Sequence, residues 1–355
     1  MKRFYHITRK KVLISSGFCT YALSSLSFQF GHMLTDCWHY VRIVGSAMRV
    51  AAIDVGSNTI RMLIGDVHGN ILSRRFIDRA ITRLAEGIGD SGMLLEKNME
   101  KSIRVLKGFS SSIEGHSANC VSAVGTSALR QARNSQEFID AVLKDTGIRI
   151  NTISGIREAE LTAKGVLLGF AESARPLFIV DIGGGSTEWI MVNPGRAGSS
   201  FSGSLQAGVV DLFERFAETD PLSPDNLRAI YGEIDSHLSH LMRKIPEHLP
   251  SDTVFVGTGG TVTTLASLDL GLRAYDANKI HMHTITAERL HRLRDLLLSL
   301  PLCKRKEMDG LEPERADLII PGILLTIKFM DFFGFSEITV SDYGLLEGLL
   351  KEANE

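Results

Sequence analysis

Two stretches of this chain share one pattern of apolar and polar positions. In each, an unbroken apolar run ends in an aspartate, a short turn of glycine and hydroxyl or amide residues follows, and a second apolar run begins. The first copy spans 50–67 and the second spans 177–192. Because short apolar runs bounded by turn residues are typical of buried strands, each copy predicts a strand–turn–strand unit.

The remaining apolar positions either recur with helical spacing or form further short runs. Further strands are predicted at 120–124, 148–153, 201–205, 253–256 and 338–341. Helices are predicted at 97–108, 135–146, 155–170, 209–216, 225–241, 262–268, 287–298, 313–333 and 345–353. This alternation favours an α/β fold with mixed sheets flanked by helices. The repeat predicts two similar domains, 48–173 and 174–355, with the closing helix packed back on the first.

The turns in both copies have the composition of phosphate-binding loops. After Asp54 come Gly56, Ser57, Asn58 and Thr59, and after Asp181 come Gly183, Gly184, Gly185, Ser186 and Thr187. Glycines let backbone N–H groups approach one anion, and the hydroxyls add further donors. A carboxylate beside them can hold a metal ion that offsets phosphate charge. Each copy alone also fits a tight hairpin with a capping aspartate, but the repetition favours phosphate.

A third glycine-rich turn follows the strand predicted at 253–256. It consists of Gly257, Thr258, Gly259, Gly260 and Thr261, and it opens the helix that starts at Val262. N–H groups at a helix N-terminus favour an anion, although such turns also serve as plain strand–helix connections. In the first two turns a strand follows, which argues against a Walker A loop, since that loop needs a Lys-Ser/Thr pair opening a helix. Together the three turns predict three walls of one phosphate site.

Glu158 is the candidate general base. It lies in the first turn of the helix predicted after Ser154, and hydrolysis of a phosphoanhydride needs a carboxylate that orients or deprotonates water. Glu160, two positions on, points to another face, so only one of the two can enter the site. The alternative is that both glutamates only complement the helix dipole.

Composition excludes some classes of protein. The 355 residues are 44% hydrophobic and 23% charged, and the net charge of −2 gives no basic field for nucleic acid. The four cysteines (Cys19, Cys37, Cys120 and Cys303) lack the spacing of a zinc site, so reduced thiols in a cytoplasm are expected. The sequence contains no apolar run of 18 residues, so we expect no membrane-spanning helix. Residues 1–47 show no period, and we expect a dispensable extension with Met48 as the natural start.

Seven segments, in this order, resemble the exopolyphosphatase / guanosine pentaphosphate phosphohydrolase family: DVGSNT, VGTSALRQARN, ISGIREAEL, DIGGGSTE, GTGGTVTTL, ERADLIIPG and SDYGLLEGLL. The resemblance covers about residues 49–350. It implies two domains of the actin, hexokinase and chaperone ATPase type (ribonuclease H-like), with the active site in the cleft between them.

The resemblance also implies roles for individual residues. Glu158 matches the second acid of a Ser-Gly-x-Glu-Glu-Ala motif and takes the base role. Asp181 and Glu188 would hold Mg²⁺ and the attacking water, with Asp54 opposite. The substrate-binding residues implied are Gly56, Ser57, Asn58, Thr59, Arg83, Arg130, Gly183, Gly184, Gly185, Ser186, Thr187, Gly257, Thr258, Gly259, Gly260 and Thr261.

Two features depart from simple expectations. Arg157 replaces the first acid of the base motif, which predicts a cation beside the base that favours its ionised form or contacts substrate. His281 and His283 could together bind a metal ion. We expect instead that they lie on an exposed strand edge or loop and bind no metal.

The expected function is Mg²⁺-dependent release of terminal phosphate from inorganic polyphosphate or guanosine pentaphosphate, by a cytoplasmic homodimer. A nucleotide-binding regulator with little turnover is the first alternative, although a sensor has no need of Glu158, Asp181 and Glu188 together. A sugar or acetate kinase of the same superfamily is the second. It would need an adenosine pocket and an acceptor site, for which the sequence shows no separate signature.

Overall fold

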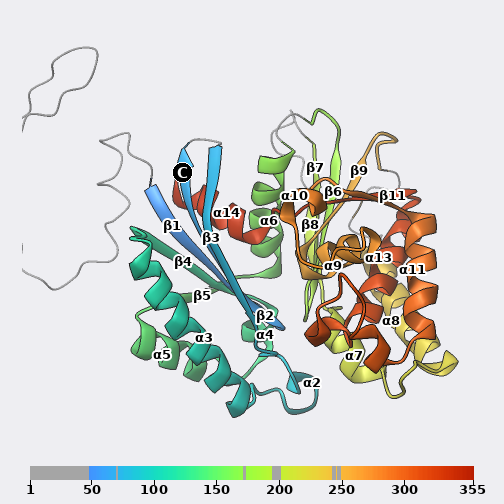
Figure 1. The fold of residues 1–355 in the computed structure, drawn as a ribbon, viewed down its shortest axis with the longest axis horizontal. Helices are drawn as coiled ribbons and strands as arrows, with labels where there is room; N and C mark the ends of the chain where they lie inside the picture. Colours follow the sequence, from blue (N-terminus) through green and yellow to red (C-terminus); the bar gives the residue numbers. More distant parts are fainter. Residues whose placement is uncertain (1–47, 69–70, 171–172, 194–200, 242–244, 246–248) are drawn as a thin grey trace, which may run out of the picture. The chain divides into compact units, whose positions relative to one another are not determined.

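The computed structural model describes residues 48–68, 71–170, 173–193, 201–241, 245 and 249–355. The predicted extension at 1–47 lies outside the described residues. The described chain forms two mixed sheets flanked by helices, as the sequence predicts (Figure 1). Among the helices built from described residues, none combines the length and the apolar character needed to cross a bilayer.

The two sheets have the same strand order when the second is read from its other edge, as β8-β7-β6-β9-β11-β10. The first runs β3-β2-β1-β4-β5, from β1 (Met48–Val55), β2 (Thr59–His68), β3 (Ile71–Ile81), β4 (Cys120–Gly125) and β5 (Ile150–Thr152). The second runs β10-β11-β9-β6-β7-β8, from β6 (Leu177–Ile182), β7 (Thr187–Val192), β8 (Phe201–Leu205), β9 (Val254–Thr258), β10 (Thr284–Thr286) and β11 (Glu337–Val340). In both, a central strand pairs antiparallel with the next strand and parallel with a later one.

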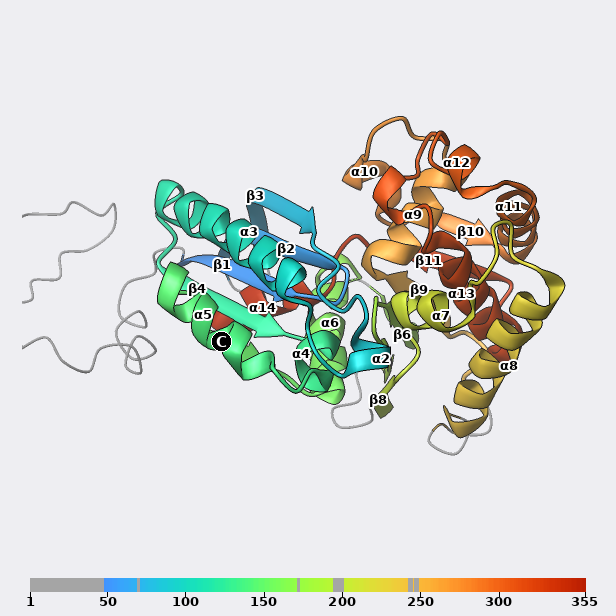
Figure 2. The same cartoon turned by 90° about the horizontal axis from the view of Figure 1, so that it is seen from below.

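Both central strands are buried on two faces. Along β1, Ile53 and Val55 face the layer of α3 (Glu96–Gly115) and α5 (Ser135–Thr146), which lie side by side (Figure 2). The alternate residues Val50 and Ala52 face α14 (Leu345–Ala353). This double burial explains why the strands read as unbroken apolar runs.

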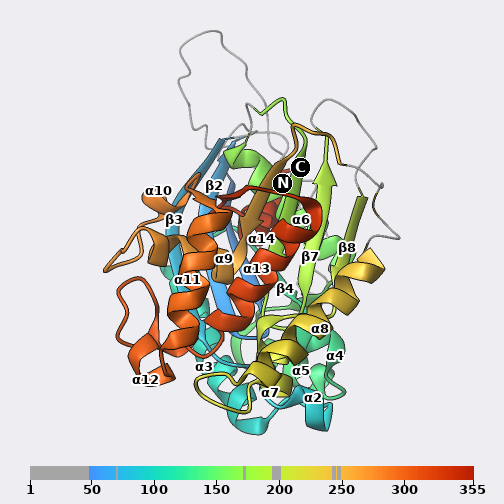
Figure 3. The same ribbon diagram turned by 90° about the vertical axis from the view of Figure 1, so that its right-hand side faces the viewer.

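The second sheet is covered in the same way. One face packs on α7 (Val209–Phe216), α8 (Pro224–Leu241), α9 (Gly259–Asp269) and α13 (Ile319–Phe333), with α11 (Ala287–Ser299) beside α13 (Figure 3). The other face packs on α6 (Gly155–Gly169), whose Ala159, Ala163 and Val166 meet Ile179 and Ile190. Thus α6, which follows the first sheet in sequence, covers the second sheet, whereas the C-terminal helix covers the first.

Within the described residues there are also four short α-helices of four or five residues: α2 (Ile88–Ser91), α4 (Ser127–Gln131), α10 (Ala277–Ile280) and α12 (Leu302–Arg305). The prediction of a single long helix at 313–333 is wrong for its first residues. Residues Pro313–Arg315 form a 3₁₀ turn, and α13 begins only at Ile319. The side chain of Arg315 is held by Glu312 and lines the pocket described below, so this segment serves the site rather than the helix.

His281 and His283 are partly buried, which corrects the exposed position predicted for them. The His281 ring stacks on Tyr343, with ring centroids 4.7 Å apart. The His283 Nε2 atom lies 2.6 Å from a carboxylate oxygen of Asp269. Both rings therefore have structural contacts of their own.

Candidate active site

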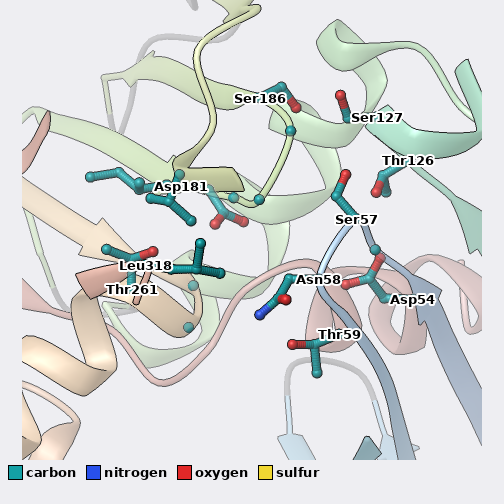
Figure 4. A pocket seen from close by; sticks show the side chains of 18 of the residues that line it. Asp54, Ser57, Asn58, Thr59, Thr126, Ser127, Asp181, Ser186, Thr261 and Leu318 are labelled. Carbon is teal, nitrogen blue, oxygen red and sulfur yellow. The ribbon is translucent and has the colours of Figure 1, made fainter. Parts of the chain in front are cut away.

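The three predicted turns meet at one pocket. It has a volume of about 90 Å³, and residues of both sheets line it. Figure 4 shows Asp54 and Asp181, from the central strands of the two sheets, directed toward the same space. The predicted residues that line it are Asp54, Gly56, Ser57, Asn58, Thr59, Glu158, Asp181, Gly183, Gly184, Gly185, Ser186, Gly259, Gly260 and Thr261.

The first turn presents polar atoms that have no protein partner. The Gly56 N–H donates to the Thr59 carbonyl at 3.2 Å and closes the turn. Within the described residues, Asp54 Oδ1, Ser57 Oγ and Asn58 Oδ1 are buried and make no hydrogen bond. Buried polar atoms are almost always hydrogen-bonded, so three such atoms in one turn are available to bind a ligand or water.

The second turn lies directly against the first. A Cβ atom on Gly185 would lie 2.7 Å from Ser57 Oγ and 2.9 Å from Ser127 Oγ. A Cβ atom on Gly184 would lie 3.0 Å from Ser57 Cβ. Any side chain at these positions would therefore push the turns apart, which explains the glycines physically.

The third turn supports the carboxylate of the second sheet. Gly259 has a φ of 84°, and a Cβ atom there would lie 2.2 Å from Asp181 Oδ1. A Cβ atom on Gly260 would lie 2.2 Å from Arg315 Nη1. These two glycines therefore make room for an acid and for a cation of the pocket.

Glu158 enters the pocket from the first turn of α6. The Ser154 hydroxyl accepts a hydrogen bond from the Arg157 N–H and caps the helix. Glu158 is 7% exposed, and Arg130 Nη1 donates to its Oε2 at 2.6 Å. A second nitrogen of the same guanidinium, Nη2, donates to Ser186 Oγ at 3.2 Å. Arg130 thus links the candidate base to the second turn.

The carboxyls of the site have abnormal pKa values. Burial raises the pKa of Glu158 well above its usual range, and the nearby Glu188 carboxylate raises it further, against the effect of Arg130. Burial and the neighbouring Asp181 raise the pKa of Glu188 to about 7. Burial also raises the pKa of Asp181, against the effect of Arg61. This excess of negative charge favours a proton or a bound cation.

Six predicted residues do not line the pocket. Glu188, Thr187 and Arg130 lie next to it: Glu188 is 2% exposed, and Thr187 donates to the Ala207 carbonyl. Gly257 packs against Ile338 and Val262, and Thr258 donates to the Tyr343 carbonyl.

The sixth residue, Arg83, is bound elsewhere. It pairs with Asp317 at 2.8 Å and donates to the Glu314 carbonyl. Its predicted place facing substrate therefore finds no support in its contacts.

Arg157 also lies outside the pocket lining. It pairs with Glu160 at 3.1 Å and with Glu352 of the C-terminal helix. The cation predicted beside the base therefore binds acids on the helix surface instead of the site.

Several lining residues were missed by the sequence analysis: Arg61, Thr126, Ser127, Ile182, Val209, Thr264, Arg315, Leu318 and Ile319. Arg61 had a signal. The first hairpin pairs Asp54 with Arg61, just as the second pairs Asp181 with Glu188, and Arg61 Nη2 donates to Asp54 Oδ2 at 2.6 Å. Arg315 follows Thr59 by 256 residues, and its Nη2 lies 3.4 Å from the Thr59 hydroxyl.

Comparison with known proteins identifies the family of this chain. Residues 64–354 match the model of the Ppx/GppA phosphatase family. The chain belongs to this family. The family resemblance and the fold predicted from the motifs are thereby confirmed.

Individual relatives of this family member cover most of its length. It is 30% identical to exopolyphosphatase 2 of Mycobacterium tuberculosis over 315 residues, 85% of this chain and 97% of that protein. It is 31% identical to a bifunctional 3-dehydroquinate synthase/phosphatase of Fusobacterium nucleatum over 86% of this chain. The chain spans about half of that longer protein, 46% of its length.

Solved structures of the family match the fold. The Aquifex aeolicus family member superposes with a TM-score of 0.73 at 30% identity, over 86% of this chain and 97% of that one. An exopolyphosphatase from Cytophaga hutchinsonii superposes with a TM-score of 0.79 at 29% identity, over 86% and 98%.

Proposed function

We propose that this family member is a Mg²⁺-dependent phosphohydrolase that removes the terminal phosphate of inorganic polyphosphate. The observation that carries the proposal is the Glu158 carboxylate in the same pocket as three glycine-rich turns. Relatives that are named exopolyphosphatases support the choice of polyphosphate. A volume of about 90 Å³ suits one end of a chain, since pockets for whole drug-sized ligands measure roughly 300–1,000 Å³.

In the proposed reaction the turns hold the terminal phosphoryl group through their N–H groups and the Ser57 and Ser186 hydroxyls. Glu158 accepts a proton from water as the water oxygen attacks the terminal phosphorus. The bond from that phosphorus to the bridging oxygen breaks. Orthophosphate is released, and the remaining polyphosphate chain is shorter by one phosphate. Arg130 holds Glu158 in place.

The residues present fit Mg²⁺. No group of three histidine, cysteine or acidic side chains in the described part of the chain is arranged as a complete ligand set. Mg²⁺ commonly uses one or two carboxylates together with substrate phosphates and water, so a partial set is sufficient. The unpartnered Asp54 Oδ1 and the buried Asp181 would supply it, with Glu188 beside them. The bound ion would neutralise charge on the phosphates.

Guanosine pentaphosphate ends in the same type of anhydride bond, and we propose it as a second substrate to be assayed beside the polymer. We also carry forward the cytoplasmic location and the homodimer as proposals from the family resemblance. A nucleotide sensor that uses the same pocket would bind these compounds without turnover, and this distinguishes it from the enzyme.

The test is phosphate release from polyphosphate, guanosine pentaphosphate and ATP, with Mg²⁺ and with EDTA. We expect Glu158→Gln to lose roughly 10²-fold or more in kcat while it still binds substrate, because the amide cannot accept the proton. Glu160→Gln is the matched control, since Glu160 lies on the same helix but pairs with Arg157. Unchanged turnover in Glu158→Gln removes the base, and no release by the wild type removes the function.

A further inference from the structure

The start of α6 lies very close to β8, the edge strand of the second sheet. A Cβ atom on Gly155 would lie 2.3 Å from Ser204 Cβ and 2.6 Å from Ser204 Oγ. It would also lie 3.5 Å from Glu188 Oε1. The first residue of α6 therefore leaves no room for a side chain between the helix, the serine and the acid.

Ser204 is bound to the acid that this contact covers. Its hydroxyl donates to Glu188 Oε1 at 2.7 Å, and the two residues are direct partners across β7 and β8. Glu188 is 2% exposed, so water cannot replace this donor easily. A hydrogen bond to a buried charged group is among the stronger ones in proteins.

The same contact fixes the candidate base. Glu158 lies three residues after Gly155, about one turn along α6, and the helix is anchored on the second sheet by Ala159, Ala163 and Val166. The packing of α6 on β6 and β7, with Gly155 against Ser204, therefore places Glu158 near the strand pair that carries Glu188.

We propose that Ser204 is a positioning residue for the phosphohydrolase reaction: its hydroxyl fixes the Glu188 carboxylate, and Gly155 lets the base-bearing helix seat against that pair. This inference rests on the proposed function. Ser204 touches neither phosphate nor water in the reaction and acts through Glu188. Residues that orient metal-binding acids in this way typically change metal affinity by about 10- to 100-fold when they are removed.

The test is Ser204→Ala, with Mg²⁺ binding measured by isothermal titration calorimetry on the full chain without substrate. We expect the Mg²⁺ dissociation constant and the Mg²⁺ concentration for half-maximal phosphate release to rise about 10- to 100-fold. The kcat at saturating Mg²⁺ and the KM for polyphosphate should change little, a pattern that general unfolding would not give. Ser202→Ala is the matched control, two residues along the same strand and opposite Ile190.

A second variant tests the seat of the helix. Gly155→Ala should lower kcat even at saturating Mg²⁺ and speed amide exchange in the first turn of α6, because the added methyl group displaces the helix from Ser204. Circular dichroism shows whether each variant is folded.

The outcomes are separable. A folded Ser204→Ala with unchanged Mg²⁺ affinity overturns the inference. If the wild type binds Mg²⁺ only together with substrate phosphates, an unchanged Mg²⁺ concentration for half-maximal phosphate release overturns it instead. If the wild type binds Mg²⁺ but releases no phosphate from any substrate, the proposed function fails. The Mg²⁺ dissociation constants of the wild type and Ser204→Ala still test the positioning role of Ser204.

Discussion

Asp54 and Asp181 hold equivalent places in the two sheets, but the residues opposite them differ in charge. Asp54 faces Arg61, whereas Asp181 faces Glu188. The first pair is neutral, and the second brings two buried acids together. Burial, together with this neighbouring acid, raises the pKa of Glu188 to about 7.

This difference predicts a pH-dependent gain of stability in Glu188→Gln. The pKa of Glu188 is raised from 4.5 to about 7 on folding, so the stability of the protonated form is present below pH 4.5 and is lost as pH rises through 7. The variant cannot ionise and should escape this loss. In EDTA at pH 8 we expect its free energy of unfolding to exceed the wild type's by on the order of a few kcal/mol.

The measurement is the melting temperature of both proteins from pH 5 to pH 8. Glu160→Gln serves as the control, because its side chain is about half exposed. The two curves should converge toward pH 5. A Glu188→Gln variant that is less stable than the wild type at pH 8 would mean that the carboxylate is compensated by neighbours.

Helices α6 and α14 cross with their backbones in contact. A Cβ atom on Gly348 would lie 1.8 Å from the Leu161 carbonyl oxygen, and one on Gly165 would lie 1.9 Å from the Gly344 carbonyl oxygen. Both obstacles are backbone atoms, which cannot rotate away as a side chain can. Small residues at a crossing are what allow two helices to approach this closely.

Gly348→Ala should therefore destabilise the protein by about 1–3 kcal/mol or more, the usual cost of forcing extra atoms into a packed site. Gly108→Ala is the control, since Gly108 is also inside a helix but a Cβ atom there would meet nothing within 4 Å. That change should stabilise the protein by roughly 0.5–1 kcal/mol, because alanine loses less backbone entropy on folding. Urea unfolding measures both, and equal effects would contradict the crossing as the cause.

Local signals in the sequence predicted most elements but not every boundary. The Gly334 end of α13 was predicted correctly because glycine adopts a left-handed φ, here 72°, at a helix terminus. The start of the same helix was placed too early. Apolar periodicity continues through Leu318, and no local rule reports that Arg315 is held at a pocket by Glu312 and reaches Thr59.

At the scale of the molecule, the sequence indicated that three turns share a site, because each turn carries its own chemistry. It could not indicate which arginines complete that site. Arg83 looked suitable but pairs with Asp317, whereas Arg315, from a segment predicted as helix, reaches the pocket. The direction in which an arginine side chain points depends on contacts between segments far apart in sequence. Local sequence patterns do not report those contacts.

One such contact joins β3 to the segment that leads into α14. Arg74 pairs with Asp342 and, at 2.7 Å, with Glu347, and its guanidinium carbon lies 4.1 Å from the centre of the Tyr343 ring. The side chains of Arg74 and Glu347 are 18% and 6% exposed. The cation therefore ties the first sheet to the chain that returns from the second sheet.

We expect Arg74→Met to destabilise the protein by about 3–5 kcal/mol, because it leaves buried carboxylates without their cation. Arg75→Met is the matched control: the neighbouring arginine pairs with Asp66, and its side chain is 54% exposed, so its loss should cost about 1 kcal/mol or less. Hydrogen exchange shows where the structure is weakened. We expect the amides of α14 to exchange faster than in the wild type in Arg74→Met but not in Arg75→Met. Adding Glu347→Gln should restore part of the stability, since it removes the stranded charge. If that double variant is no more stable than Arg74→Met, the ring contact with Tyr343 rather than the ion pair holds the two segments together.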